Sequence, residues 1–256
     1  MRQAVADDCR LPSYAVRPGV TFPDWAAVTS PEARKAMLAI FEAISAERIW
    51  RSYTPAEDAV RTTLLRLYAE QGRAPVIGDL ARHAGVSESA IRLHLASLEA
   101  RDLVVLDADG ERIVGAYPWT DRETEHRVSL GERTLSALCA IDALGAGDMY
   151  GRDVEISSRC RACVAPVTIA TSDRGRAVAE VQPGSAVVWS GIRETDGCAA
   201  GSICTVIAFF CEDAHLAAWR AEHHPEAPGF RLSIDEALQA GRAIFGPSLA
   251  GLEVTS

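Results

Sequence analysis

The sequence predicts an α+β fold in which a helical N-terminal domain precedes a mixed or antiparallel β-sheet core with flanking helices. Two observations predict it. Helical periodicity dominates the first hundred residues, whereas short β-type stretches follow one another between residues 153 and 211. With 256 residues, 48% of them apolar and 24% charged, the chain suits one large domain or two smaller ones, and disorder over its whole length is excluded.

The N-terminal region combines an irregular arm with one helix. Residues that disfavour regular structure punctuate the arm and predict that it lies on the surface: Pro12, Pro18, Gly19 and Pro23. From Ser30 the apolar residues recur at three- and four-residue spacing, with Ser30 as the N-cap and Pro31 in the first helical position. We therefore expect one amphipathic helix over residues 30–50.

Residues 56–116 predict three helices followed by a hairpin. Glycines end the first two helices and Ser87 caps the third, and two β-branched runs surround an Asp-Gly turn at residues 109–110. The expected helices cover residues 56–72, 74–85 and 87–102. This order resembles a winged helix-turn-helix domain. The chain is accordingly divided into an arm and helix (1–54), a winged-helix-like domain (55–118) and an α+β domain (119–256).

The charge of the winged-helix-like region argues against a nucleic-acid partner. Winged helices commonly insert their third helix into the major groove of DNA. Residues 73–115 carry five arginines and seven carboxylates, and the whole chain has a net charge of −9, so phosphate neutralisation is poorly supplied. We expect this domain to serve as a scaffold, and a DNA-binding regulator is the alternative.

The remainder of the chain predicts a linker, a buried helix, strands and two final helices. Residues 116–133 read as a linker, and the nearly all-apolar residues 133–145 predict a short buried helix. Strands are expected within residues 153–159, 165–171, 176–182, 186–192 and 203–211. Helical periodicity returns over residues 212–224 and 233–246.

Hydropathy and cysteine usage indicate a cytoplasmic protein with no membrane partner. No apolar run approaches the ~20 residues that a spanning helix needs, and the acidic N-terminus lacks the apolar core of a secretion signal. Seven cysteines are present, six of them between residues 139 and 211. An odd number in a chain without an export signal favours reduced thiols over a disulfide framework, and concentrates the search for function in that region.

Cys139 and Asp142 form the first candidate pair. At a spacing of three residues they share one face of the predicted buried helix. Burial raises the pKa of an aspartate and keeps a proton available for donation. A structural aspartate and a small core cysteine are the alternative interpretation.

Three segments, TLSALCAIDALG, GRDVEISSRC and ICTVIAFFCEDAHLAAWRAEHH, together resemble the organomercurial (alkylmercury) lyase family over roughly residues 55–245. That family has a Cys-x-x-Asp motif, another cysteine about twenty residues later, and a catalytic cysteine five residues before a Phe-Phe pair and a Trp-containing helix. The corresponding positions here are Cys139, Asp142, Cys160, Cys204, Phe209, Phe210 and Trp219. The connection containing Thr124 and His126 also looks like the family's.

The resemblance implies an enzyme that cleaves the carbon–mercury bond by protonolysis. Cys139 and Cys204 would bind mercury, a soft ion that thiolates select, with Asp142 beside the metal. Asp142 would take up a thiol proton and then protonate the leaving carbon. The two sulfurs should then lie about 4–6 Å apart. A small organomercurial is the implied substrate, a hydrocarbon and thiol-bound Hg(II) the products, and cellular thiols or a mercuric reductase the acceptors. No organic cofactor is expected.

Two departures from the family pattern leave other functions open. Leu138 replaces an aromatic residue, and residues 205–208 replace a polar, histidine-containing stretch. Either change could alter the organic group that fits, which allows a diverged enzyme acting on another substrate. A thiol-based soft-metal sensor that binds DNA through the winged helix is a third hypothesis, and the acidic helix-turn-helix argues against it.

The other thiols and histidines carry weaker signals. Cys160 and Cys163 form a Cys-x-x-Cys pair, but a zinc site needs a second half-site, and Cys198, His215, His223 and His224 lack the expected spacing. Cys160 and Cys163 are therefore interpreted as structural or accessory thiols, ahead of zinc or redox roles. We expect Cys9, Cys198 and Cys211 to be incidental, and the two adjacent histidines to cap a helix.

Overall fold

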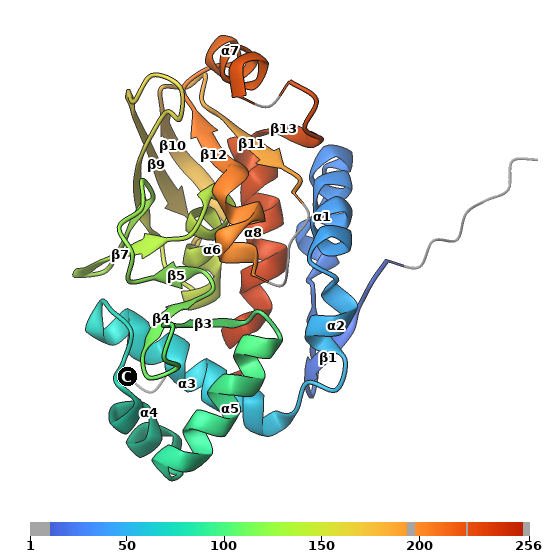
Figure 1. Cartoon of the computed structure of the whole chain (residues 1–256). Coiled ribbons are helices and arrows are strands. Elements are labelled where there is room, and N and C mark those ends of the chain that lie inside the picture. Colours follow the sequence, from blue (N-terminus) through green and yellow to red (C-terminus); the bar gives the residue numbers. More distant parts are fainter. Residues whose placement is uncertain (1–10, 194–197, 224, 253–256) are drawn as a thin grey trace, which may run out of the picture.

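Antiparallel sheets form the core of the fold in a computed structural model that describes residues 11–193, 198–223 and 225–252. The larger sheet has eight strands in the order β10-β9-β8-β6-β7-β5-β4-β3, and a three-stranded sheet has the order β12-β11-β13. Helices pack around both sheets (Figure 1). The predicted α+β class with antiparallel pairing and flanking helices is confirmed.

The strands of the two sheets are between two and seven residues long. Those of the large sheet are β3 (Val104–Leu106), β4 (Ile113–Ala116), β5 (Trp119–Thr120), β6 (Arg127–Leu130), β7 (Arg133–Ala137), β8 (Glu155–Arg159), β9 (Pro166–Ser172) and β10 (Ala177–Gln182). The small sheet contains β11 (Val187–Gly191), β12 (Ile207–Phe210) and β13 (Gly229–Ser233). The last of these strands was not predicted from the sequence.

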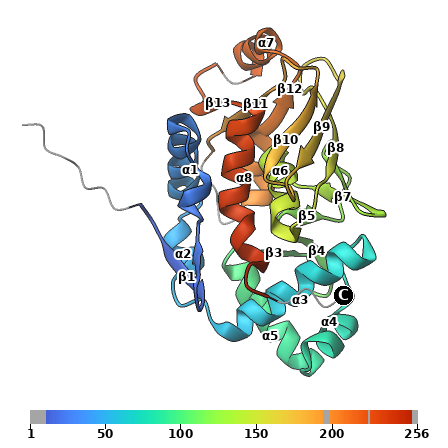
Figure 2. The same ribbon diagram turned by 180° about the vertical axis from the view of Figure 1, so that it is seen from behind.

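The described residues also form eight α-helices. They are α1 (Pro31–Ala43), α2 (Ala46–Trp50), α3 (Pro55–Gln71), α4 (Ile77–Ala84), α5 (Glu88–Ala100), α6 (Ala140–Tyr150), α7 (Asp213–His223) and α8 (Ile234–Leu249). Seen from behind, α8 lies next to α6 (Figure 2). A Cβ atom on Gly145 of α6 would approach the Gly241 carbonyl oxygen of α8 to 2.5 Å, so glycines permit this close packing. The contact fixes α6 deep in the core.

The N-terminal region is more regular than predicted. The supposed surface arm forms the hairpin β1 (Tyr14–Arg17) and β2 (Val20–Phe22), and Phe22 is buried. The single helix expected over residues 30–50 is divided into α1 and α2. Ser45 takes a left-handed conformation, with φ of 52°, which interrupts the helix and redirects the chain.

The predictions for residues 116–145 were wrong in two respects. The supposed linker supplies β5 and β6, which lie inside the large sheet. Residues 133–137 form β7 rather than the first turns of a helix, because β5 and β6 pair with them on both sides. The buried helix begins only at Ala140. A short apolar run fits either a strand or a helix, and here the neighbouring strands decide.

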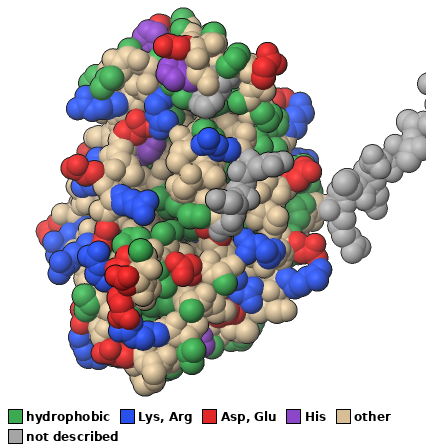
Figure 3. Space-filling view, in the orientation of Figure 1, with side chains coloured by type: hydrophobic (Ala, Val, Ile, Leu, Met, Phe, Trp, Pro, Cys, Tyr) green, Lys and Arg blue, Asp and Glu red, His purple; other side chains and the backbone are tan. Residues whose placement is uncertain are grey.

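The three helices and hairpin expected over residues 56–116 are present as α3, α4, α5 and the β3–β4 pair. This hairpin also continues through β5 into the large sheet. On the face drawn in Figure 3, acidic and basic side chains are interspersed over the lower part of the molecule. Arg92 of α5 is paired with Glu111 at 2.7 Å, so that arginine already has an anionic partner.

We predict that the chain does not bind a defined DNA duplex at physiological salt. The reason is the acidic balance of the α4–α5 region together with the net charge of −9. Fluorescence anisotropy with labelled duplexes over a range of salt concentrations would test this. Sub-micromolar, salt-sensitive binding to one sequence would contradict it and favour the sensor hypothesis.

None of the helices in the described residues is both long and apolar enough to cross a membrane.

Candidate active site

Cys139, Asp142 and Cys204 converge at the N-terminus of α6. Cys139 is the N-cap of this helix, and its sulfur accepts a hydrogen bond of 3.4 Å from the Asp142 backbone N–H. Cys204 lies in the 3₁₀ helix η3 (Ile203–Val206), directly before β12. The two sulfurs and a carboxylate oxygen all lie within 4.8 Å of one another, and all three side chains are buried. Both sulfurs are within reach of a single two-coordinate metal ion.

The three side chains line a largely apolar cavity of about 100 Å³. Much of its wall comes from the N-terminal segment, through Phe22, Phe41 and Trp50. The rings of Phe22 and Trp50 contact each other with centroids 4.3 Å apart. Residues 11–54, for which the sequence suggested no role in the site, therefore help to enclose it.

Burial controls the ionisation of the site. It raises the pKa of Asp142 to about 7, although hydrogen bonds from Cys139 and Cys204 act in the opposite direction. Burial also raises the pKa of Cys139, and the neighbouring Cys204 and Asp142 add to the shift. The hydrogen bond with Cys139 lowers the pKa of Cys204, but burial and nearby carboxylates raise it overall. Neutral thiols thus lie beside a carboxyl group that is partly protonated at neutral pH.

Comparison with known proteins identifies the family. The alkylmercury lyase family profile matches residues 119–246. The alkylmercury lyase of Staphylococcus epidermidis is 31% identical over 180 residues, which cover 70% of this chain and 78% of that protein. The chain belongs to the alkylmercury lyase family. It is therefore an enzyme that cleaves the carbon–mercury bond of organomercurials.

Further relatives agree with this assignment. The alkylmercury lyase of Streptomyces lividans is 28% identical over 188 residues, covering 73% of this chain and 82% of that protein. Among solved structures, the mercury-bound form of MerB2 superposes with a TM-score of 0.65 at 25% identity, covering 86% of this chain and all of that one. The alkylmercury lyase resemblance inferred from the sequence motifs is confirmed.

Sequence reasoning missed three polar residues of the lyase cavity, Arg61, Asp102 and Tyr117. Asp102 accepts hydrogen bonds of 2.8 Å from the Tyr117 hydroxyl and from the Ala199 backbone N–H. The Tyr117 hydroxyl in turn accepts one of 2.8 Å from the Ala200 N–H. Burial, with Cys204 and Asp102 nearby, raises the pKa of Tyr117 and keeps its hydroxyl neutral. No local pattern marks Asp102 or Tyr117, because their partners are distant in the sequence.

The two departures from the family pattern lie differently in the site. Leu138 is partly buried and packs against the core. Within residues 205–208, Thr205 is exposed and Ile207 lines the cavity. An apolar side chain therefore forms this part of the cavity wall.

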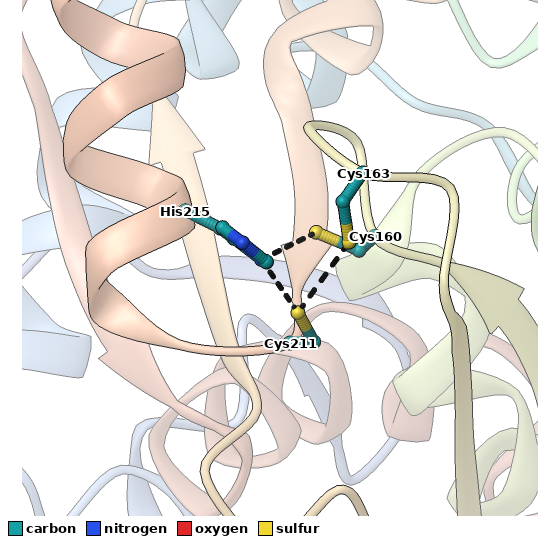
Figure 4. Close-up of side chains that lie close together, drawn as sticks. All are labelled: Cys160, Cys163, Cys211 and His215. Carbon is teal, nitrogen blue, oxygen red and sulfur yellow. Dashed lines mark hydrogen bonds between the residues drawn. The ribbon is translucent and has the colours of Figure 1, made fainter.

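A second cluster of thiols lies between the β8–β9 loop and the start of α7 (Figure 4). Cys160, Cys163, Cys211 and His215 bring their sulfurs and one ring nitrogen within 4.8 Å of one another. Cys211 was expected to be incidental and His215 to lack suitable spacing, and the structure places both beside Cys160 and Cys163. Cys211 and His215 form a Cys-x-x-x-His half-site, the signal in the sequence that could have revealed the cluster.

The structure describes two of the four remaining cysteines and histidines for which the sequence made predictions, His223 and Cys198. His223 lies at the end of α7 with Nδ1 3.1 Å from the Trp219 carbonyl oxygen, in agreement with the predicted capping role. Cys198 is partly exposed and is not among the grouped donors. Cys9 and His224 lie outside the described residues.

Proposed function

We propose that this lyase breaks the carbon–mercury bond by protonolysis, with Cys139 and Cys204 as mercury ligands and Asp142 as the proton carrier. One observation supports the proposal above others. Two thiols and a carboxyl group whose pKa is raised to about 7 lie within 4.8 Å of one another in an apolar cavity. Soft sulfur donors suit mercury, and an acid with a pKa near the working pH suits proton transfer.

The proposed steps conserve atoms and charge. The sulfur of Cys139 or Cys204 displaces the anionic ligand X of R–Hg–X, and the proton of that thiol passes to the Asp142 carboxylate. The second sulfur then binds mercury, while the carbon takes the proton from Asp142. The second thiol proton leaves with X as HX. The products are R–H and Hg(II) held by two thiolates, without any change in oxidation state.

Contacts around Asp142 fit a group that transfers a proton. Its Oδ2 is buried and has no hydrogen-bond partner within the described part of the chain. Such an atom is costly to leave unpaired unless something else engages it. In the proposal, that partner is first the thiol proton and then the leaving carbon. Exclusion of water from the apolar cavity also prevents water from replacing the thiols at the metal.

The proposal includes the substrate class and the fate of the metal. The cavity suits an organomercurial with a small apolar organic group, because rings and aliphatic side chains form most of its wall. A related structure, MerB2, has been solved in a mercury-bound form, which supports mercury as the metal. External thiols, or a mercuric reductase, are proposed to remove Hg(II), and the reaction needs no organic cofactor.

A product assay tests the proposed function. Purified protein is incubated with phenylmercury or methylmercury and excess small thiol, and the headspace is analysed for benzene or methane. We expect enzyme-dependent release of the hydrocarbon with Hg(II) recovered on the thiol. Binding of the organomercurial without any hydrocarbon would contradict the proposal and favour a sensor.

We also predict that kcat/KM rises with pH through about pH 7. Asp142 must be ionised in the free enzyme to accept a thiol proton, and its pKa of about 7 sets the midpoint. Below that pH the carboxyl group is protonated and mercury capture slows. Steady-state rates with phenylmercury between about pH 5.5 and 8 would measure this rise in kcat/KM. A flat profile over this range would contradict the role of Asp142 as proton acceptor.

A further inference from the structure

We propose that Cys160, Cys163, Cys211 and His215 bind one zinc ion in a structural site separate from the mercury site. The four donor atoms lie within 4.8 Å of one another (Figure 4). They belong to two segments that are nearly fifty residues apart in the sequence, the β8–β9 loop and the start of α7 with the residues before it, so the ion would join them. None of the four lines the substrate cavity.

The distances between donors fit a tetrahedral ion. With zinc–sulfur bonds of about 2.3 Å, the edges of the tetrahedron measure about 3.8 Å. The sulfurs of Cys163 and Cys211 are 3.7 Å apart, and Cys160 Sγ is 3.9 Å from His215 Nδ1. Cys211 Sγ and His215 Nδ1 are closer, at 2.8 Å, and would separate by about 1 Å when an ion enters.

The donor set and its spacing select zinc among common metals. Three thiolates with one imidazole form a recognised structural zinc set. Cys160-x-x-Cys163 and Cys211-x-x-x-His215 supply two half-sites of the usual length. Iron–sulfur clusters commonly use four cysteines, and calcium or magnesium would require oxygen donors.

Surrounding groups already orient the donors. The Glu212 carboxylate lies 3.6 Å from His215 Nε2, the nitrogen that faces away from the proposed ion. A carboxylate in this position fixes the ring and strengthens it as a ligand. Backbone N–H groups of Cys211, Cys163 and Ala162 donate to the Cys160 sulfur, and such donors stabilise a thiolate.

The loop that carries the two cysteines of the first half-site is held in a strained turn just after Cys163. Val164 has a φ of 65°, which is unfavourable for a β-branched residue, and its N–H donates to the Cys160 carbonyl oxygen at 2.9 Å. Its side chain is 59% exposed, so apolar packing does not explain the conformation. A metal ion bound by the preceding cysteines supplies a reason for this turn.

The proposed zinc site is connected to the segment that carries Cys204. Arg161, between the two cysteines, donates to the Thr205 carbonyl oxygen at 3.0 Å, and its backbone N–H donates to the Phe209 carbonyl oxygen at 3.0 Å. An ion that orders this loop would therefore also support η3 and β12.

Metal analysis of the full chain tests the proposal. The protein is purified under reducing conditions without mercury, and zinc is measured by plasma mass spectrometry. We expect about one zinc ion per chain. Replacement of zinc by Co(II) should give the intense visible bands of a tetrahedral site and a thiolate charge-transfer band. Cys163→Ser and His215→Ala should lose most of the bound metal, and Cys163 is exposed enough to be replaced without damage to the core.

Two variants sharpen the test. Cys198→Ser removes a thiol outside the cluster and should retain zinc fully. Glu212→Gln keeps all four donors and should weaken zinc affinity by about 10-fold or more. Substitution of a glutamate that does not orient a ligand would leave the zinc affinity unchanged. The proposal is overturned if the parent protein binds neither zinc nor Co(II) through thiolates, if it contains a Cys163–Cys211 disulfide as purified, or if Cys198→Ser loses as much zinc as Cys163→Ser.

Discussion

Asp142→Asn lowers turnover of organomercurials by about 10²–10⁴-fold, the usual contribution of a general acid. Asparagine has nearly the same size and polarity but carries no ionisable proton. Because both thiols remain, the variant should still bind the organomercurial and hold it, although capture is slower because asparagine cannot accept the thiol proton. Steady-state release of benzene measures turnover. Stoichiometric retention of phenylmercury by the desalted protein, measured by mass spectrometry, tests whether the organomercurial is still bound.

Asp109→Asn is the matched control, because it makes the same chemical change at an exposed turn residue that does not line the cavity. It should turn over at the parent rate. Parent-like turnover by Asp142→Asn would mean that the proton comes from another group. The proposed mechanism would then be wrong even though the substrate is right.

Cys139→Ser and Cys204→Ser have a different and larger effect, because they weaken capture itself. A hydroxyl group is a harder and far less acidic ligand than a thiol, so mercury loses one of its two soft donors. We expect turnover to fall below that of Asp142→Asn, with retention of phenylmercury or Hg(II) also lost after desalting against small thiols. Cys139→Ser keeps an N-cap oxygen for α6, so loss of the helix does not explain the result.

Cys198→Ser controls for the removal of a thiol and should retain both capture and turnover. If either active-site serine variant kept full mercury retention and turnover, that cysteine would not be a ligand. A circular dichroism spectrum and melting temperature for each variant would separate loss of chemistry from loss of folding.

Local signals in the sequence predicted most helices, and the family resemblance predicted which three residues converge at the start of α6. Ser30, Thr54 and Ser87 cap helices as their residue types favour, and the glycines at 72 and 85 end helices in the left-handed conformation. Cys139 and Asp142 were recognised as neighbours, but for a partly incorrect reason. Cys139 is not inside a helix. It caps one, and Asp142 occupies the first turn.

The missed features depend on contacts between distant segments. Phe22 was predicted to belong to a surface arm. Its place in the cavity wall is apparent only when α1 and α2 are seen to pack over the cavity. Asp102 and Tyr117 acquire their role only when η2 (Ala199–Gly201) approaches them. Sequence spacing specifies local neighbours but not which strands pair, so β5 to β7 were misread as a linker and a helix.

The second thiol cluster was missed for a different reason, because the spacing of its cysteines and histidine is visible in the sequence. Cys160 and Cys163 were recognised as a pair, whereas Cys211 and His215 were each judged alone. Cys211 lies in the connection between β12 and α7, and His215 lies four residues later in the first turn of α7. The approach of β8 and β12, which brings the two half-sites together, could not be inferred from either segment separately.

A single-turnover experiment in D₂O tests protonolysis most directly. Excess protein, equilibrated in D₂O so that its thiol and carboxyl protons are exchanged, is mixed with phenylmercury, and the volatile product is analysed by mass spectrometry. The account predicts singly deuterated benzene, with Hg(II) left on the protein. Benzene without deuterium, or a phenyl group transferred to a cysteine sulfur, would contradict it.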